Sequence, residues 1–487
     1  MGNTLGLDLG TSAVKALLIG PDQQVIASAS SSLTMQRPQP GWSEQDPLSW
    51  QSAACKAIDA IHQTHPQQLQ KLTGIGLSGQ MHGATLLNDA DQPLRPAILW
   101  NDTRSHQEAA TLDANPVFRR ETGNIVFPGF TAPKLLWCQQ HEPDLFGQIR
   151  TVLLPKDFLR LWLTGEKVTD PSDAAGTSWL DVGKRTWSEN LLQASGLELS
   201  AMPSIVEGSQ PSGQLRTELA NRWGITAAVT VAGGAGDNAA SACGLGVIAA
   251  GTAFASLGTS GVLFAANDAY RPNPASAVHT FCHALPQTWH QMGVVLSATD
   301  ALNWYAGIVG QPAATLAAEL DNSPSQPPSE ITFTPYLSGE RTPHNEPRPL
   351  GSFLGLSHQH DRQAMTRAVL TGVAFAIRDC LEALASTGTR LSSVTAVGGG
   401  SQSGAWLQIL SNALQLPVDV PTEGDFGAAL GAARLGHIAA SGADPASICL
   451  PPAIQQRYEP EATVEQAYRE SYQTYRQAYP ALSALLP

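Results

Sequence analysis

Apolar and polar residues alternate with two different periods along this chain, and segments of the two kinds follow one another. Near the start, Leu5, Leu7 and Leu9 are separated by small or polar residues, and a second apolar run at residues 14–19 follows a turn. Alternation at every second position on both sides of a tight turn predicts a β-hairpin. Other segments place apolar residues three and four positions apart, which predicts helices with one buried face.

Two helices are predicted most clearly in the second half of the chain. One spans residues 405–414, and the other carries apolar residues at Met365, Val369, Leu370, Val373, Ile377, Leu381 and Leu384. A stripe of tyrosines near the end, which we interpret as the packing face of a closing helix rather than a stacking platform, consists of Tyr468, Tyr472, Tyr475 and Tyr479. Strands and helices alternate along the chain, which predicts an α/β fold.

A short sequence repeat indicates that the chain has two similar halves. Leu9-Gly10-Thr11-Ser12 and Leu257-Gly258-Thr259-Ser260 match residue for residue, and both lie between apolar runs at a predicted hairpin turn. Duplicated units of this kind predict two similar domains, which we place at residues 1–246 and 247–487. A homodimer is compatible with the sequence.

Composition excludes several classes of protein. The 487 residues are 43% hydrophobic and 14% charged, with a formal net charge of −13. An acidic surface repels phosphate backbones, so we expect no nucleic-acid partner. The six cysteines form no C-x-x-C pair, and no apolar run reaches the roughly 18 residues that a membrane span needs. We therefore expect a cytoplasmic protein with neither a membrane segment nor a signal peptide.

The Gly-Thr-Ser turns are candidate phosphate-binding sites. The chain has no G-x-x-x-x-G-K-[ST] loop, which excludes a Walker-type site. Each turn instead offers backbone N–H groups and hydroxyl donors, which hold phosphate oxygens without net positive charge. Asp8, before the first turn, is a candidate to hold Mg²⁺ through water. Alternatively, both segments are ordinary hairpin turns, in which Gly and Ser are common. The candidate phosphate-binding residues are Thr11, Ser12, Lys15, Gly258 and Thr259.

A run of three glycines is a candidate adenosine site. Gly398, Gly399 and Gly400 follow an apolar run at residues 394–397 and precede the predicted helix at residues 405–414. Consecutive glycines let a flat ligand lie against the backbone at a helix N-terminus, so we expect Gly399 and Gly400 to contact adenosine or its phosphates. The alternative is a loop that only requires a positive φ angle.

Asp237 follows a glycine turn and precedes an alanine-rich segment with helical character. Two interpretations remain open at this point. Asp237 either caps the helix, with a contribution of about 1 kcal/mol, or acts as a general base that the bare turn presents to a substrate hydroxyl. The two are compatible, because a capping carboxylate at the edge of a cleft can also accept a proton.

Residues 78–83 interrupt two strand-like runs and combine polar groups with an apolar side chain. Met81 and His82 lie between glycines there, and Trp100 and Asn101 follow the next predicted strand, at residues 97–99. Hydrogen-bonding groups beside an apolar wall are typical of sites for small polyhydroxylated molecules, so these four residues are candidates for substrate binding. A purely structural loop is the alternative.

The motifs above resemble those of the FGGY family of carbohydrate kinases. The stretches that carry the resemblance are residues 77–83 (LSGQMHG), 98–104 (ILWNDTR), 154–157 (LPKD) and 234–238 (GAGDN). The resemblance implies an actin-like ATPase fold, in which two RNase H-like domains flank a catalytic cleft. It also implies that Asp237 is the catalytic base and that Asp8 is the second catalytic carboxylate, on the metal side.

The resemblance further implies ATP-dependent phosphorylation of a small sugar, with ATP and Mg²⁺ as cofactors. Met81 and His82 match the sugar-binding pair, Gly258 and Thr259 the second phosphate turn, and Gly399 and Gly400 the adenosine loop. Residues 80–82 stand where glycerol kinases carry an arginine-containing loop, which favours a pentulose, D-xylulose. Alternatives are another sugar or polyol kinase of the family (for ribulose, fuculose or gluconate) and an actin- or chaperone-like ATPase.

Overall fold

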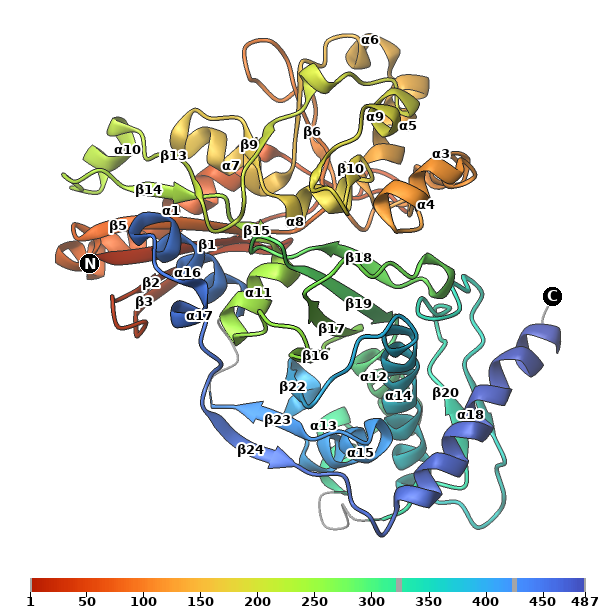
Figure 1. The fold of residues 1–487 in the computed structure, drawn as a ribbon. Coiled ribbons are helices and arrows are strands. Elements are labelled where there is room, and N and C mark those ends of the chain that lie inside the picture. Colours follow the sequence, from red (N-terminus) through yellow and green to blue (C-terminus); the bar gives the residue numbers. More distant parts are fainter. Residues whose placement is uncertain (1, 321–325, 423–426, 486–487) are drawn as a thin grey trace.

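A computed structural model describes residues 2–320, 326–422 and 427–485 (Figure 1). Two seven-stranded sheets, one in each half of the chain, organise the molecule. The first consists of β1 (Asn3–Leu9), β2 (Ala13–Ile19), β3 (Val25–Ser32), β5 (Leu72–Gly79), β13 (Pro211–Gln214), β14 (Thr230–Ala232) and β15 (Ala235–Gly236). The second consists of β16 (Ala253–Leu257), β17 (Gly261–Asn267), β18 (His279–Cys282), β19 (Trp289–Val295), β22 (Val394–Val397), β23 (Val418–Pro421) and β24 (Ile454–Tyr458).

The two sheets share one strand order. The order β3-β2-β1-β5-β14 in the first sheet corresponds to β19-β17-β16-β22-β23 in the second. In each, three antiparallel strands are followed by two strands that run parallel to the first. The two predicted hairpins are confirmed, with turns at residues 10–12 and 258–260. The predicted α/β class and the internal repeat therefore both appear in the sheet topology.

The first sheet lies between two layers of helices. Leu5, Leu7 and Leu9 share a core with α1 (Pro47–Thr64) and α7 (Pro155–Thr164). Leu17 and Ile19 point to the other face and contact α16 (Gly427–Ser441), which lies beside α11 (Asp237–Leu245). The period-two alternation in the sequence thus separates the two faces of the sheet.

Helices of the second half cover one face of the second sheet. The predicted helices are confirmed as α14 (Arg362–Ala385) and α15 (Gly404–Leu414), and α18 (Glu465–Leu485) packs against both. Three tyrosines of the stripe are buried in the same core, so the packing interpretation is confirmed; they are Tyr468, Tyr472 and Tyr475. The other helices that the site description uses are α8 (Pro171–Ala174), α12 (Thr299–Val309), α13 (Ala313–Ala318) and the 3₁₀ helices η1 (Ala175–Thr177) and η4 (Gly399–Gln402).

Helix α16 comes late in the chain but packs on the first sheet. It follows β23 in sequence, yet it contacts β1, β5 and α11, and Figure 1 shows it in blue beside the red and green elements. The division at residues 246 and 247 stays a prediction, since this segment joins the two parts. Among the described residues, no helix is both long and apolar enough to cross a lipid bilayer.

Glycines allow α16 to approach its neighbours at backbone distance. A Cβ atom on Gly76 of β5 would lie 1.7 Å from the carbonyl oxygen of Ala432, and one on Gly6 of β1 would lie 2.0 Å from that of Ala429. On the helix itself, a Cβ on Gly431 would lie 1.7 Å from a backbone oxygen of α11. These contacts involve backbone on both sides, so no side-chain rearrangement can accommodate a larger residue.

We expect Gly76→Ala to lower the free energy of unfolding by about 3 kcal/mol or more, because the added methyl group overlaps the backbone of α16. Urea unfolding measures the difference. Gly147→Ala is the matched control: its Cβ would meet no atom closer than 3.6 Å, so its stability should change by less than about 0.5 kcal/mol. Equal stability of the two variants would contradict the close packing of α16.

Candidate active site

Two carboxylates lie at the same edge of the first sheet, Asp8 on β1 and Asp237 directly after β15. In the register of the parallel strands β1, β5 and β15, Asp8 is opposite Ser78, and Ser78 is opposite Ala235. The carboxyl ends of parallel strands form the edge at which α/β proteins commonly bind ligands. The structure therefore brings together the two acidic residues predicted from the sequence.

Asp237 is the first residue of α11, and the N-cap position belongs to Gly236. The prediction that Asp237 caps the helix is therefore wrong. A capping side chain accepts from an N–H two or three residues further on. Asp237 Oδ1 instead accepts hydrogen bonds from the N–H and the side-chain amide of the next residue, Asn238, at 2.7 and 3.0 Å. These bonds orient the carboxylate at the start of the helix.

The environment of this edge raises the pKa values of both carboxyl groups. Burial, followed by the negative charge of Asp8, raises the pKa of Asp237 to about 6, against the opposing hydrogen bonds from Asn238. Burial also raises the pKa of Asp8, and the Ser78 side chain and the Lys15 charge oppose that rise. Lys15 lies directly opposite Asp8 in the β1–β2 pairing. Near neutral pH, Asp237 is mostly ionised yet close to its titration point.

Carbonyl oxygens of the first Gly-Thr-Ser turn accept hydrogen bonds from residues of the same half. Gln45 Nε2 donates to the carbonyl oxygen of Thr11 at 2.6 Å, and the carbonyl of Ser12 accepts from the N–H of Leu33 at 2.8 Å. The N–H groups of Thr11 and Ser12 donate to no atom of the described residues. Ser12 is exposed, so the turn presents its donors outward, as the phosphate interpretation requires.

Thr11 also connects this turn to the predicted substrate segments. Its hydroxyl accepts a hydrogen bond from Trp100 Nε1 at 3.0 Å and lies 3.2 Å from Gln80 Oε1, to which it donates. Trp100 is 48% exposed. The side-chain amide of Asn101 instead contacts the Met35 sulfur at 3.7 Å. The structure thus brings Trp100 to the first Gly-Thr-Ser turn, whereas the substrate roles of Trp100 and Asn101 stay predictions.

His82 is held in one orientation and one tautomer. Its ring stacks on Phe130 with 4.5 Å between centroids, and its Nδ1 lies 2.7 Å from the carbonyl oxygen of Gly176. Burial lowers the pKa of His82 to about 3, so the ring is neutral near pH 7. Because a carbonyl oxygen only accepts, Nδ1 carries the proton and Nε2 is an acceptor.

Met81 forms an apolar wall beside the turn that carries Asp237. It is buried, and its sulfur would lie 2.9 Å from a Cβ placed on Gly236. Its terminal methyl would lie equally close to a Cβ on Gly176. Met81 is therefore packed between the acidic turn and the segment that binds His82, which is the neighbourhood predicted for the substrate.

The second Gly-Thr-Ser turn is anchored on α12. The carbonyl of Gly258 accepts from the N–H and the hydroxyl of Thr299 at 2.9 and 2.8 Å, and the carbonyl of Thr259 accepts from the N–H of Ala298 at 2.8 Å. Thr259 is exposed. As in the first turn, the carbonyl oxygens are bonded to the surrounding structure, so this turn also has the polarity expected of a phosphate site.

The glycine run packs against the second turn but also borders open space. Gly398 has a φ angle of 90°, and a Cβ there would lie 2.9 Å from the carbonyl oxygen of Leu257. The requirement for positive φ therefore explains Gly398. It does not explain Gly399, which has no positive φ and whose Cβ would meet nothing within 4 Å. Gly399 and Gly400 line a pocket of about 340 Å³ together with Trp406 and residues of α12 and α13.

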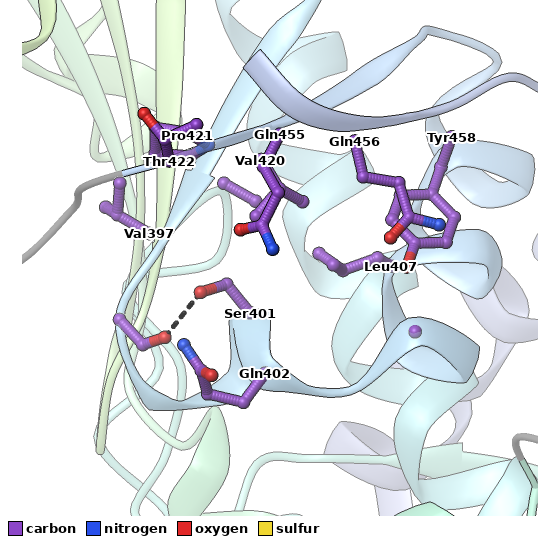
Figure 2. Close-up of a pocket in the computed structure, with 13 residues that line it drawn as sticks. Val397, Ser401, Gln402, Leu407, Val420, Pro421, Thr422, Gln455, Gln456 and Tyr458 are labelled. Carbon is purple, nitrogen blue, oxygen red and sulfur yellow. Dashed lines mark hydrogen bonds between the residues drawn. The ribbon is translucent and has the colours of Figure 1, made fainter. Parts of the chain in front are cut away.

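A second pocket lies on the other side of the same loop. Figure 2 shows Gln402 from η4 and Gln455 from β24 on opposite sides of it, with Leu407 and Tyr458 at one end. Its volume is about 470 Å³. The loop is held by the Ser401 hydroxyl, which donates to the carbonyl of Gly398 at 2.7 Å. The first pocket, lined by alanines and an indole ring, is the more apolar environment and suits a flat ring better.

Several residues behind Asp237 were not predicted from the sequence. Lys156, Arg160, Asp170 and Ser172 are buried and form hydrogen bonds and ion pairs beneath the turn. For Lys156 and Arg160, charged residues inside the otherwise apolar segment at residues 154–163 were the available signal. Among the described residues, no group of three or more His, Cys, Asp or Glu side chains is placed to hold a metal ion.

Two family models cover most of the chain. Residues 3–244 match the N-terminal domain, and residues 253–440 the C-terminal domain, of the FGGY family of carbohydrate kinases. The chain is 48% identical to the xylulose kinase of Escherichia coli (strain K12) over 487 residues, which is 99% of each chain. It is 46% identical to the xylulose kinase of Klebsiella pneumoniae, again over 99% of each.

Solved structures agree with these relationships. The crystal structure of a xyloylose kinase from Brucella ovis matches with a TM-score of 0.98 at 61% identity, covering 99% of this chain and 100% of that chain. The xylulose kinase from Rhodospirillum rubrum matches with a TM-score of 0.92 at 28% identity, covering 99% of both. The predicted actin-like ATPase fold, with two sheet-containing parts, is thereby confirmed.

We expect Asp237→Asn to raise the free energy of unfolding near pH 7.5 by about 1 to 3 kcal/mol, because a buried, ionised carboxylate costs stability that a neutral amide does not. The gain should disappear as the pH falls through about 6 towards 4, where the wild-type carboxyl group is protonated too. Urea unfolding near pH 7.5 and pH 4.5 measures it. Asp268→Asn, at a side chain that is 71% exposed, is the control. A gain that is equal at both pH values would contradict the burial argument.

Proposed function

This chain belongs to the FGGY family of carbohydrate kinases, and we propose that it transfers the γ-phosphoryl group of ATP to D-xylulose, giving ADP and D-xylulose 5-phosphate. The observation that carries the proposal is the likeness to xylulose kinases over the whole chain, at 48% identity to the Escherichia coli enzyme. The loop with Met81 and His82, together with the carboxylate of Asp237, supplies groups suited to a polyhydroxylated acceptor.

Asp237 is the proposed general base. Its carboxylate accepts the proton of the terminal hydroxyl of the sugar as that oxygen attacks the γ-phosphorus in line. The pKa of Asp237, raised to about 6 by burial and by Asp8, supports this role, because a base works best when it titrates near the working pH. The neighbouring Asn238 fixes one carboxylate oxygen and so orients the other.

The phosphates are proposed to lie between the two Gly-Thr-Ser turns. In the first half Thr11, Ser12 and Lys15 contact them, and in the second half Gly258 and Thr259 do so. Asp8 fits a water-mediated Mg²⁺ site, since its carboxylate stands at the same strand edge and Mg²⁺ is usually held by one or two carboxylates plus phosphate oxygens and waters. The ion would neutralise charge on the phosphate oxygens.

The sugar is proposed to lie against Met81 with its hydroxyl groups near His82, Trp100 and Asn101. The fixed tautomer supports a defined role for His82: its Nε2 accepts a hydrogen bond from a sugar hydroxyl. The adenosine of ATP is assigned to the pocket that Gly399 and Gly400 line. Residues 1–246 then supply the acceptor site, and residues 247–487 bind the nucleotide. A cytoplasmic location belongs to the same proposal, because all six cysteines are free thiols.

In an assay of ADP release, we expect the wild-type protein to use D-xylulose with a kcat/KM at least about tenfold above those for D-ribulose and glycerol.

In the same assay, Asp237→Asn should lower kcat by at least about 10²-fold, because the amide cannot accept the proton. The exposed Asp268→Asn variant should keep wild-type turnover. A preference for another sugar would assign the protein to a different branch of the family, and normal turnover in Asp237→Asn would remove that residue from the mechanism.

Gly399→Ala tests the adenosine pocket. Because its Cβ meets no protein atom within 4 Å, the variant should fold with a stability change of less than about 0.5 kcal/mol. The methyl group would occupy space assigned to adenosine, so the KM for ATP should rise about tenfold with little change in the KM for the sugar. Gly147→Ala serves as the control for both constants. An unchanged KM for ATP would place adenosine elsewhere, with the pocket in Figure 2 as the next candidate.

A further inference from the structure

The turn that presents Asp237 has few side chains of its own to hold it. Residues 233–236 contain three glycines and one alanine, and Gly234 has a φ angle of 72°. Such a turn is held by contacts from outside. On one side, the guanidinium of Arg160 donates to the carbonyl oxygens of Ala232 and Gly233. On the other, the N–H of Gly236 donates to Ser172 Oγ at 3.1 Å.

Ser172 is itself held by a buried acidic residue. Its hydroxyl donates to Asp170 Oδ2, and the same oxygen accepts from the backbone N–H of Ser172 at 2.8 Å. The other oxygen of Asp170 lies 2.8 Å from Lys156 Nζ. A continuous series of contacts therefore runs from Lys156 through Asp170 and Ser172 to Gly236, the residue that precedes Asp237.

Lys156 is the centre of a cluster of charges enclosed in the protein. Its Nζ lies 2.6 Å from Asp157, 2.8 Å from Asp170 and 3.2 Å from Asp173, and all four side chains are fully buried. Arg160 adds a second positive charge 3.7 Å from Asp157. Burial raises the pKa of Asp173 well above its usual value, and the positive charge of Lys156 opposes that rise. Separating any pair would leave an uncompensated buried charge, which keeps the cluster in one arrangement.

The same segment also fixes the histidine predicted to bind the sugar. Residues 170–177 comprise Asp170, α8 and η1, and Gly176 in η1 accepts the Nδ1–H of His82 at 2.7 Å. Segment 170–177 thus contacts the backbone next to Asp237, the proposed base, through Ser172. Through Gly176 it contacts the imidazole ring of His82, which is proposed to bind the sugar. The two groups that would orient the same sugar share one support.

We propose that Ser172 is a positioning residue for the phosphoryl transfer, which holds the Gly236–Asp237 backbone at a fixed place relative to His82, and that Lys156 fixes the segment that carries it. This inference rests on the proposed function for the role of Asp237. Ser172 touches neither sugar nor nucleotide. Its contribution is to keep the carboxylate of Asp237 within reach of the hydroxyl whose orientation His82 determines.

The Ser172→Ala variant carries the test, because Lys156→Met would leave three buried carboxylates without their cation and is expected to unfold. Ser195→Ala is the matched control: Ser195 is equally buried, and its hydroxyl accepts from Trp179 Nε1 at 3.0 Å and, within the described part of the chain, forms no hydrogen bond with Gly236 or Asp170. With ATP and D-xylulose, kcat per folded Ser172→Ala molecule should fall about 10- to 100-fold, while the KM for ATP stays within about twofold. Ser195→Ala should keep both constants.

Two further readouts separate positioning from general damage. A looser turn admits water to Asp237, and since burial is the main cause of its raised pKa, the acid limb of the pH–rate profile should move to lower pH in Ser172→Ala alone. Amide hydrogen exchange at Gly236 should accelerate in Ser172→Ala and not in Ser195→Ala. Exchange is independent of the substrate, so it tests the anchor even if D-xylulose proves to be the wrong sugar. Unchanged exchange, or faster exchange with unchanged kcat and pH profile, would overturn the proposal.

Discussion

The arrangement of the site depends on the backbone contact between α16 and the first sheet. Gly6 on β1, Gly76 on β5 and Gly431 on the helix let main chains approach where any side chain would overlap. β1 carries Asp8, β5 leads into the loop with His82, and α11, which also packs on α16, begins with Asp237. Helix α16, a late segment of the chain, therefore fixes the relative positions of β1, β5 and α11, which all have one end at the site. Since backbone-to-backbone contacts cannot relax by changing rotamers, the geometry at the strand ends is rigid.

This rigidity has an electrostatic cost that is concentrated at Asp8 and Asp237. Both carboxylates are largely removed from water, and the second also experiences the charge of the first, so both pKa values are raised. In contrast, the buried acids around Lys156 have partners that compensate them. The charge of Asp8 and Asp237 is therefore only partly compensated, whereas the acids around Lys156 are paired with cations. This distribution is expected when the first pair acts on a ligand and the second group supports it.

Local features of the fold could be predicted from the sequence, and long-range ones could not. Periodicity and turn residues, which are properties of short segments, predicted the hairpins around Thr11 and Thr259 and helix α14. The packing of α16 on β5 joins residues more than 350 positions apart, with no sequence signal beyond scattered glycines. The candidate site shows the same contrast: its residues were proposed from motifs, but the bond from Trp100 to Thr11 and the support of Gly236 by Ser172 depend on tertiary contacts. The capping interpretation of Asp237, one of two left open by the sequence, is wrong for this reason, because the exact start of a helix depends on its surroundings.

The residues proposed to bind the sugar and those proposed to bind ATP belong mainly to different halves of the chain. The enzyme must therefore control the relative position of the two halves. Asp237, His82 and Thr11 belong to elements of the first half and are connected within it, whereas the second turn and the glycine run belong to the second half. Between the halves, Asn124 exchanges two hydrogen bonds with the backbone of Thr280, at 2.8 and 2.9 Å, in a buried position. In-line transfer requires the attacking oxygen of the sugar to be placed relative to the γ-phosphorus to within about 1 Å. Residues of the first half are sufficient to hold the sugar in a fixed position. The distance from the sugar oxygen to the phosphorus therefore depends on the relative position of the two halves, and hydrogen bonds such as those of Asn124 limit how far that position can vary.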